Sequence, residues 1–135
     1  LAEMGHGDEI VIADANFTAA SLAAGKPIVR LPGAGVERAS QAVLSLLALD
    51  AAVAQPVAFM QVSEYPAGTL SALQRRMLAW LQQAGHAEPA QCEATERFAF
   101  YERVRGAFAI VLTSELQPYG NFLYKKGVIG EALVP

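Results

Sequence analysis

The architecture of this chain follows from segment 5–16, which reads Gly-His-Gly-Asp-Glu-Ile-Val-Ile-Ala-Asp-Ala-Asn. Its central part, Glu9–Asp14, contains a β-branched run and is long enough to cross one sheet, because a strand rises about 3.3 Å per residue. We expect Asp14 at the carboxyl end of this strand, where open α/β sheets bind ligands. His6, uncrowded between two glycines, adds an imidazole to the same unit, and the pair suits acid/base chemistry.

Strand-like and helix-like patterns alternate along the rest of the chain. Further strands are predicted at Pro27–Leu31, Gln55–Val62, Ala107–Thr113 and Asn121–Lys125. Helices are expected between them, so the sequence predicts an α/β fold. We expect residues 1–135 to form a single three-layer domain, with a mixed, mainly parallel sheet covered by helices on both faces.

Three helices are predicted from apolar residues at helical spacing. The second of them begins at Thr69 as its N-cap and ends at Gly85, and the third covers Arg97–Arg105. Residues 1–4 read as the last turn of a helix that Gly5 ends, so we expect a truncated N-terminal helix. The predicted inner faces are Val36, Ala39, Val43, Leu46 and Leu47; Leu70, Leu73, Met77, Leu81 and Ala84; and Phe98, Tyr101 and Val104.

Composition narrows the classes of partner. Hydrophobic residues make up 53% of the chain and charged residues 17%. This is more apolar surface than a small domain usually buries, so we expect a homo-oligomer. The net charge is −3 and the basic residues are mostly scattered, so neither nucleic acid nor a membrane is expected as a partner.

Cysteine and histidine usage bears on location and cofactors. Cys92 is the only cysteine, and a free thiol is typical of the reducing cytoplasm. We expect Cys92 to be a small buried hydrophobic residue, and His86, which follows Gly85, to be exposed. The sequence contains neither a Cys/His ligand cluster nor a glycine-rich phosphate loop, so no metal and no other cofactor is expected.

Polar groups able to bind a small molecule occur in three places. His6 and Asp14 flank the first strand, Arg97 opens the third predicted helix, and Tyr119-Gly120-Asn121 forms a turn before the last strand. A phenol and an amide within three residues suit sugar hydroxyls. We expect these groups to surround one small polar pocket near His6, because loops at one end of a sheet bring separate segments together.

Each of these groups also has a purely structural interpretation. His6 suits a turn, and Asp14 suits the cap of the turn that follows it. Arg97, taken alone, suits a helix surface and an ion pair with Glu93 or Glu96. Residue types and spacing leave these alternatives open.

Together the segments resemble the family of fucose mutarotases and ribose pyranases, small proteins that interconvert sugar anomers. The resemblance is closest to the fucose mutarotase branch and covers nearly the whole chain. It rests on residues 1–10 (Leu-Ala-Glu-Met-Gly-His-Gly-Asp-Glu-Ile), 14–17 (Asp-Ala-Asn-Phe), 97–103 (Arg-Phe-Ala-Phe-Tyr-Glu-Arg), 107–111 (Ala-Phe-Ala-Ile-Val), 119–121 (Tyr-Gly-Asn) and 125–128 (Lys-Lys-Gly-Val).

The resemblance implies roles for the polar groups. His6 stands at the position of the family's proposed proton donor, and Asp14 at that of an aspartate that binds the sugar. Arg97 also occupies a sugar-binding position, where the ribose pyranase branch has histidine. Further binding groups are implied at Tyr119, Gly120 and Asn121.

One residue departs from the family pattern. A proline usually follows the Asp-Ala-x-Phe stretch, whereas this chain has Thr18, so the loop lacks the φ that proline imposes. The resemblance also implies an assembly, because relatives form rings of ten subunits or smaller oligomers with sites near subunit contacts.

The implied function is that of a cofactor-free mutarotase interconverting the α and β anomers of L-fucose or a related monosaccharide. Ring opening needs a proton delivered to the ring oxygen and one removed from the anomeric hydroxyl, and closure reverses both. One acid and one base suffice, and histidine, with an unperturbed pKa of about 6.5, can exchange protons near neutral pH. Two alternatives stay open: a D-ribose pyranase, which Arg97 disfavours, and a non-catalytic sugar-binding module, which needs no proton carrier at His6.

Overall fold

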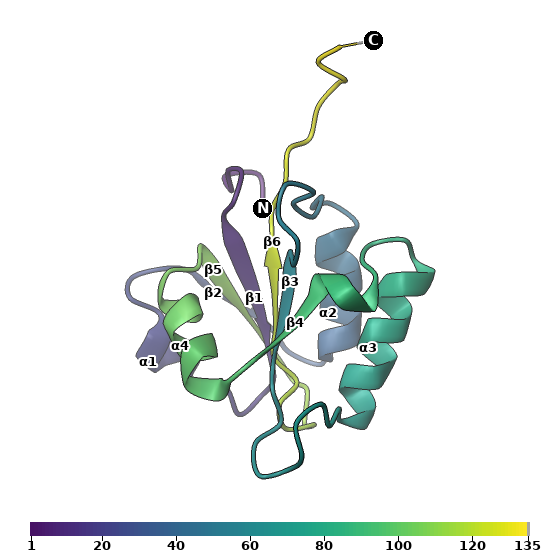
Figure 1. The fold of residues 1–135 in the computed structure, drawn as a ribbon. Coiled ribbons are helices and arrows are strands. Elements are labelled where there is room, and N and C mark those ends of the chain that lie inside the picture. Colours follow the sequence, from purple (N-terminus) through teal and green to yellow (C-terminus); the bar gives the residue numbers. More distant parts are fainter. Residues whose placement is uncertain (135) are drawn as a thin grey trace.

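A six-stranded sheet crosses the centre of the molecule in the order β2-β5-β1-β6-β3-β4 (Figure 1). The structure is a computed structural model that describes residues 1–134. β5 pairs in parallel with β1 and β2, and β3 pairs in parallel with β4, whereas β6 runs antiparallel to β1 and β3. The mixed, mainly parallel sheet is thus confirmed. Its strands are β1 (Glu9–Ala13), β2 (Ile28–Leu31), β3 (Val57–Met60), β4 (Cys92–Thr95), β5 (Ala109–Thr113) and β6 (Phe122–Lys125).

Helices cover both faces of this sheet, so the three-layer prediction is also confirmed (Figure 1). α2 and α3 lie on one face, and α1 and α4 on the other. The separation follows from the alternation of side chains along a strand, since Ile10 and Ile12 of β1 point to α2 and α3 while Val11 and Ala13 point to α1 and α4. The helices are α1 (Ala19–Leu22), α2 (Val36–Leu44), α3 (Ala72–Gln83) and α4 (Arg97–Arg105), with a 3-10 turn, η1, at Pro89–Gln91.

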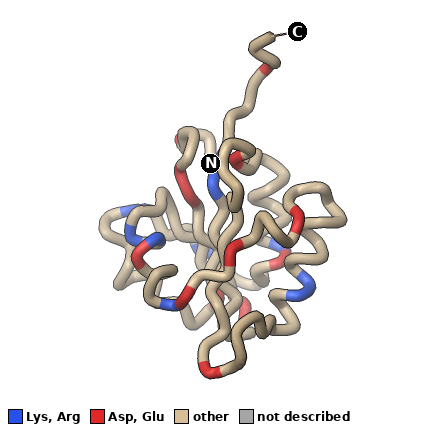
Figure 2. The backbone as a smooth tube through the Cα atoms, viewed as in Figure 1, with Lys and Arg blue, Asp and Glu red and all other residues tan. Residues whose placement is uncertain are grey.

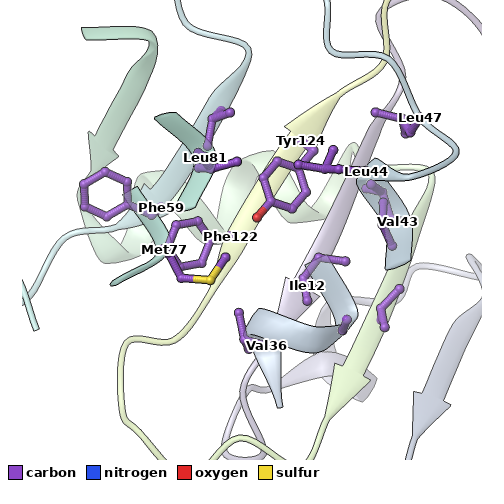
Figure 3. Close-up of a cluster of buried hydrophobic side chains, with 14 of the residues drawn as sticks. Ile12, Val36, Val43, Leu44, Leu47, Phe59, Met77, Leu81, Phe122 and Tyr124 are labelled. Carbon is purple, nitrogen blue, oxygen red and sulfur yellow. The ribbon is translucent and has the colours of Figure 1, made fainter. Parts of the chain in front are cut away.

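The larger half of the core lies between the sheet and α2 and α3 (Figure 3). Ile12 and Phe122 from the strands meet Val36 and Met77 from the helices. Burial of such side chains contributes about 1.5–3 kcal/mol each before the cost of ordering. Cys92 belongs to this core, as expected, and burial raises the pKa of its thiol to about 11.

The start of α3 differs from the sequence prediction. The N-cap is Ser71 rather than Thr69: its hydroxyl accepts a hydrogen bond from the Gln74 amide, and the Gln74 side chain accepts one from the Ser71 amide. The Thr69 hydroxyl does not cap the helix, because it donates a hydrogen bond to the Pro66 carbonyl at 2.6 Å. The predicted end at Gly85 is confirmed, with a φ of +76°.

The buried face of α4 also differs. Phe100 and Val104 are its fully buried residues, whereas Phe98 is 66% exposed and Tyr101 is half-buried. Leu46 was expected on the inner face of the first predicted helix, but α2 ends at Leu44 and Leu46 is 71% exposed. The α4 error arises because a helical pattern does not show which face the rest of the chain covers, and the Leu46 error because apolar spacing continues past the last residue of α2.

Three local predictions need a further correction. Residues 1–4 form a hydrogen-bonded turn and no helix, and the left-handed glycine nearby is Gly7 rather than Gly5. His86 is half-buried against Trp80, with ring centroids 5.3 Å apart, rather than exposed. The short elements α1 and β4 had no recognisable pattern in the sequence.

The two ends of the sheet carry different groups. β1 starts next to the loop that holds His6, where the Gly7 amide donates to the Lys126 carbonyl at the end of β6. β1 ends at Ala13, and Asp14 follows it directly, close to the loop that connects β5 to β6. Figure 1 shows the N-terminal loop and the C-terminal tail at one end of the sheet, opposite that connection.

Charge is spread over the surface. Figure 2 shows Lys and Arg interspersed with Asp and Glu around the visible side of the molecule. Within residues 1–134, no helix combines the length and apolar character needed to cross a bilayer.

Candidate active site

A cavity of about 210 Å³ opens at the end of the sheet where β1 stops. It is smaller than the ~300–1,000 Å³ usual for drug-sized ligands, so it suits a small molecule. Four residues singled out from the sequence line it, from three separate segments: Asp14, Arg97, Tyr119 and Asn121. The remaining lining residues are Asn16, Phe17, Met60, Tyr101 and Pro118.

Asp14 is 3% exposed and is held by backbone amides. Its two carboxylate oxygens accept hydrogen bonds from the Asn16 amide at 3.0 Å and from the Gly120 amide at 3.1 Å. Burial raises the pKa of Asp14, and these hydrogen bonds oppose that effect. The carboxylate therefore caps the following turn, as its structural interpretation suggested, while also facing the cavity.

The turn before β6 is tied to Asp14 from both sides. The Asn121 side-chain oxygen accepts a hydrogen bond from the Asp14 amide at 2.8 Å, and Asn121 is 3% exposed. Gly120 does not itself line the cavity, but no other residue would fit there. A Cβ at Gly120 would lie 2.9 Å from the Leu73 side chain and 3.0 Å from the Gln117 carbonyl oxygen.

Arg97 is the first residue of α4 and is fixed by aromatic neighbours. Its Nε donates to the Tyr101 hydroxyl at 2.9 Å, and its guanidinium carbon lies 5.5 Å from the ring centroids of both Phe98 and Tyr101. The hydrogen bond to Tyr101 raises the pKa of Arg97, so the group stays cationic. Glu96 does not pair with it directly, because Glu96 caps α4 through the Phe98 and Ala99 amides.

His6 lies at the other end of the sheet. Its Nε2 is 3.0 Å from Oδ1 of Asp50, which is 4% exposed, while the His6 side chain is 50% exposed. The Ala52 amide lowers the pKa of Asp50, and the contact with His6 lowers it further, so an ionised carboxylate faces the imidazole. A carboxylate on one ring nitrogen orients a histidine and leaves the other nitrogen available for proton transfer.

The expectation of one pocket near His6 does not hold within a single chain. The seven residues between His6 and Asp14 include all five of β1, and a strand of five residues spans roughly 16 Å at about 3.3 Å per residue. The two ends of a strand lie at opposite ends of the sheet, so residues that are close in sequence can be far apart in the fold.

Two polar groups accompany the candidate residues, and neither of them was assigned a role in the site from the sequence. Tyr101 was assigned to the core, but it lines the cavity, and its hydroxyl accepts a hydrogen bond from Arg97. Asp50 was passed over, although it is an isolated acid within an apolar stretch and such an acid is seldom buried without a partner. Glu102, further along α4 than Arg97, pairs with Arg105. No group of three or more His, Cys, Asp or Glu spaced for a metal occurs in the described part of the chain.

The chain is similar to known proteins over almost its whole length. The model of the RbsD / FucU transport protein family matches residues 1–129. The L-fucose mutarotase of Actinobacillus pleuropneumoniae is 42% identical over 129 residues, covering 95% of this chain and 86% of that protein. The crystal structure of the fucose mutarotase of Streptococcus pneumoniae in complex with L-fucose has a TM-score of 0.83 at 34% identity, covering 96% of this chain and 89% of that one.

A more distant structure shares the fold. Bacillus subtilis RbsD complexed with D-ribose has a TM-score of 0.71 at 23% identity, covering 96% of this chain and 89% of that one. With the family model matched over almost the whole length and relatives above 40% identity, the resemblance noted in the sequence is confirmed: the chain belongs to the RbsD / FucU family.

Proposed function

We propose that this protein is a cytoplasmic, cofactor-free mutarotase that interconverts the α and β anomers of L-fucose or a related monosaccharide. The observation that carries the proposal is the cavity that gathers Asp14, Arg97, Tyr119 and Asn121. A carboxylate, a guanidinium, a phenol and an amide supply both donors and acceptors, which sugar hydroxyls need. The 42% identity to L-fucose mutarotases supports fucose as the substrate.

The chemistry needs only proton transfers. An acid protonates the ring oxygen, a base takes the proton of the anomeric hydroxyl, the bond from C1 to the ring oxygen breaks, and an aldehyde forms. Rotation about the C1–C2 bond presents the other carbonyl face, and the reverse transfers close the ring. Tyr101, which lines the cavity, offers a hydroxyl, and His6 offers an imidazole oriented by Asp50.

The position of His6 leads to a site shared between two copies of the chain. His6 is half-exposed at one end of the sheet, and the cavity opens at the other end. A head-to-tail contact would bring His6 of one copy to the cavity of the next. Such a contact repeats from copy to copy and closes into a ring where the rotation allows it, which fits the expected homo-oligomer.

Exchange NMR on the wild-type protein tests the activity directly. We expect L-fucose anomers to interconvert faster with the protein than without it, and His6→Ala to reduce the acceleration by about 10²-fold or more. The Lys126→Ala variant, at a half-buried residue outside the proposed site, is the control and should match wild type. Sugar binding without acceleration would leave a non-catalytic binding module as the function.

Complementation tests the shared site. His6→Ala and Arg97→Ala should each be nearly inactive alone, while oligomers refolded from a mixture of the two should regain a substantial part of the activity. Recovery requires that some sites take the imidazole from one variant and the guanidinium from the other. A mixture as inactive as its components would show that each chain acts alone.

The ribose alternative is tested at Arg97. Arg97→His reproduces the residue that the resemblance assigns to ribose pyranases, so we expect the ratio of ribose to fucose exchange to rise. If wild type already prefers ribose, the fucose assignment is wrong.

A further inference from the structure

Gln74 makes more hydrogen bonds than a helix cap requires. It lies in the first turn of α3 and is fully buried, with 0% exposure, yet it does not line the cavity. Its Oε1 accepts from the Ser71 amide at 3.1 Å, which completes the capping box. Its Nε2 donates in two other directions, to the Met60 carbonyl at 2.8 Å and to the Tyr119 carbonyl at 3.0 Å.

Both carbonyls belong to residues that line the cavity. Met60 is the last residue of β3, and Tyr119 opens the turn before β6. One carboxamide therefore ties the end of a strand to the turn, from the side of the sheet that faces α3. A capping box alone would be satisfied by any side-chain acceptor at this position and would not use the two Nε2 hydrogens.

The turn needs such support because the backbone conformation of Tyr119 is unfavourable. Tyr119 has a φ of +60°, a left-handed conformation that side chains other than glycine rarely adopt. Conformations of this kind persist only where surrounding contacts impose them. The next amide, that of Gly120, donates to Asp14, so a relaxed Tyr119 would also disturb the carboxylate in the cavity.

We propose that Gln74 is a positioning residue for the sugar site: its Nε2 holds Tyr119 in the left-handed conformation and so sets the places of Gly120, Asn121 and Asp14. The assignment rests on the proposed function, in which these groups bind the sugar. Gln74 acts through the turn and does not itself touch the substrate.

Gln74→Met against Ser71→Ala is the decisive comparison. The methionine has a similar volume but no donor, so the two carbonyls lose their partner; we expect KM for L-fucose to rise about tenfold. Ser71→Ala weakens the start of the same helix and leaves Nε2 in place. It should lower the unfolding temperature while KM stays within about twofold of wild type.

Gln74→Glu provides a second route if Gln74→Met folds poorly. A carboxyl group can still accept from the Ser71 amide, and when protonated it can donate to one of the two carbonyls. Burial against carbonyl oxygens raises the pKa of such a carboxyl. Fucose affinity of this variant should therefore approach the wild-type value at low pH and fall relative to wild type as the pH rises.

Two outcomes overturn the assignment: equal KM values for Gln74→Met and Ser71→Ala, or a wild-type pH profile of affinity for Gln74→Glu. The amide resonance of Gly120 in ¹H–¹⁵N spectra separates this failure from failure of the proposed function, because it needs no substrate. It should shift in Gln74→Met and stay near its wild-type position in Ser71→Ala, even if wild type converts no fucose.

Discussion

Asp14 combines a structural task with a place in the cavity. Its carboxylate satisfies two backbone amides, and its own amide holds Asn121. Burial nevertheless raises its pKa, so the folded state favours the protonated form more than the unfolded state does. A charge kept in a binding site at some expense of stability is a common feature of functional residues.

This leads to a pH-dependent prediction for Asp14→Asn. The raised pKa contributes stability below the ordinary aspartate value of 3.8, and that contribution is lost as the pH rises through the pKa of the folded state. Over this window the free energy of unfolding of wild type should fall relative to that of Asp14→Asn. Urea denaturation at a series of pH values measures the difference, and the exposed Glu102→Gln serves as control. A difference that stays constant with pH would contradict the prediction.

Position 120 requires glycine because there is no room for a side chain, and not because the backbone is left-handed there. An added Cβ would lie within 3.0 Å of Leu73 and of the Gln117 carbonyl oxygen. Gly120→Ala should therefore cost roughly 1–3 kcal/mol of unfolding free energy through overpacking, and it should weaken fucose binding because the turn moves. Gly106→Ala, whose Cβ would make only an ordinary 3.7 Å contact, is the matched control. Equal unfolding temperatures for the two variants would argue against a tight turn.

At the scale of elements, the loop from β1 to α1 contains the one residue noted above as departing from the family pattern. Thr18 stands where the family usually has proline, and its φ is −78° with no side-chain hydrogen bond capping α1. That angle falls within the about −65 ± 15° that proline imposes. The substitution therefore leaves φ at a value that proline would also allow.

Thr18→Pro should accordingly stabilise the protein. Proline restricts the unfolded chain, which at a compatible site adds about 0.4–1 kcal/mol to the free energy of unfolding. Thermal unfolding should show a higher midpoint for Thr18→Pro and no gain for Thr18→Ala. A lower midpoint for the proline variant would mean that the loop needs the freedom of threonine.

At the scale of the whole molecule, exposed apolar side chains gather toward both ends of the sheet. Phe98 and Leu116 lie toward the end with the cavity, and they are 66% and 79% exposed. Val128 and Ile129 lie toward the end with His6, and they are 72% and 66% exposed. Two different apolar ends suit a head-to-tail contact, which buries unlike surfaces against each other.

Charged substitutions at one of these apolar ends should therefore dissociate the oligomer and reduce the activity at the same time. Light scattering of wild type should give a mass above that of a monomer at micromolar concentration. Phe98→Asp combined with Leu116→Asp should give a monomer that keeps its circular dichroism but accelerates fucose exchange far less. Val29→Asp, on the edge strand β2, is the control for a charge at an exposed apolar site. A monomeric wild type, or a fully active monomeric variant, would refute the shared site.

Residue patterns predicted most of the alternating strands and helices, the three-layer arrangement and the position of Asp14 at the carboxyl end of β1. These depend on short-range periodicity and on turn chemistry, which neighbouring residues decide. The family resemblance added Arg97 and the Tyr119 turn, and folding places both beside Asp14. Their roles in binding stay predictions.

Which distant groups come into contact depends on the folded chain as a whole. The fold separates His6 from Asp14 by the length of β1, pairs His6 with Asp50, and connects Gln74 to the turn. Residues separated by tens of positions make these last two contacts, so no local pattern signals them. The folded chain also places the N-cap of α3 at Ser71 rather than at Thr69. The Thr69 hydroxyl is bound to the Pro66 carbonyl, whereas the Ser71 hydroxyl accepts from the Gln74 amide, and the residue types alone do not distinguish these two partners.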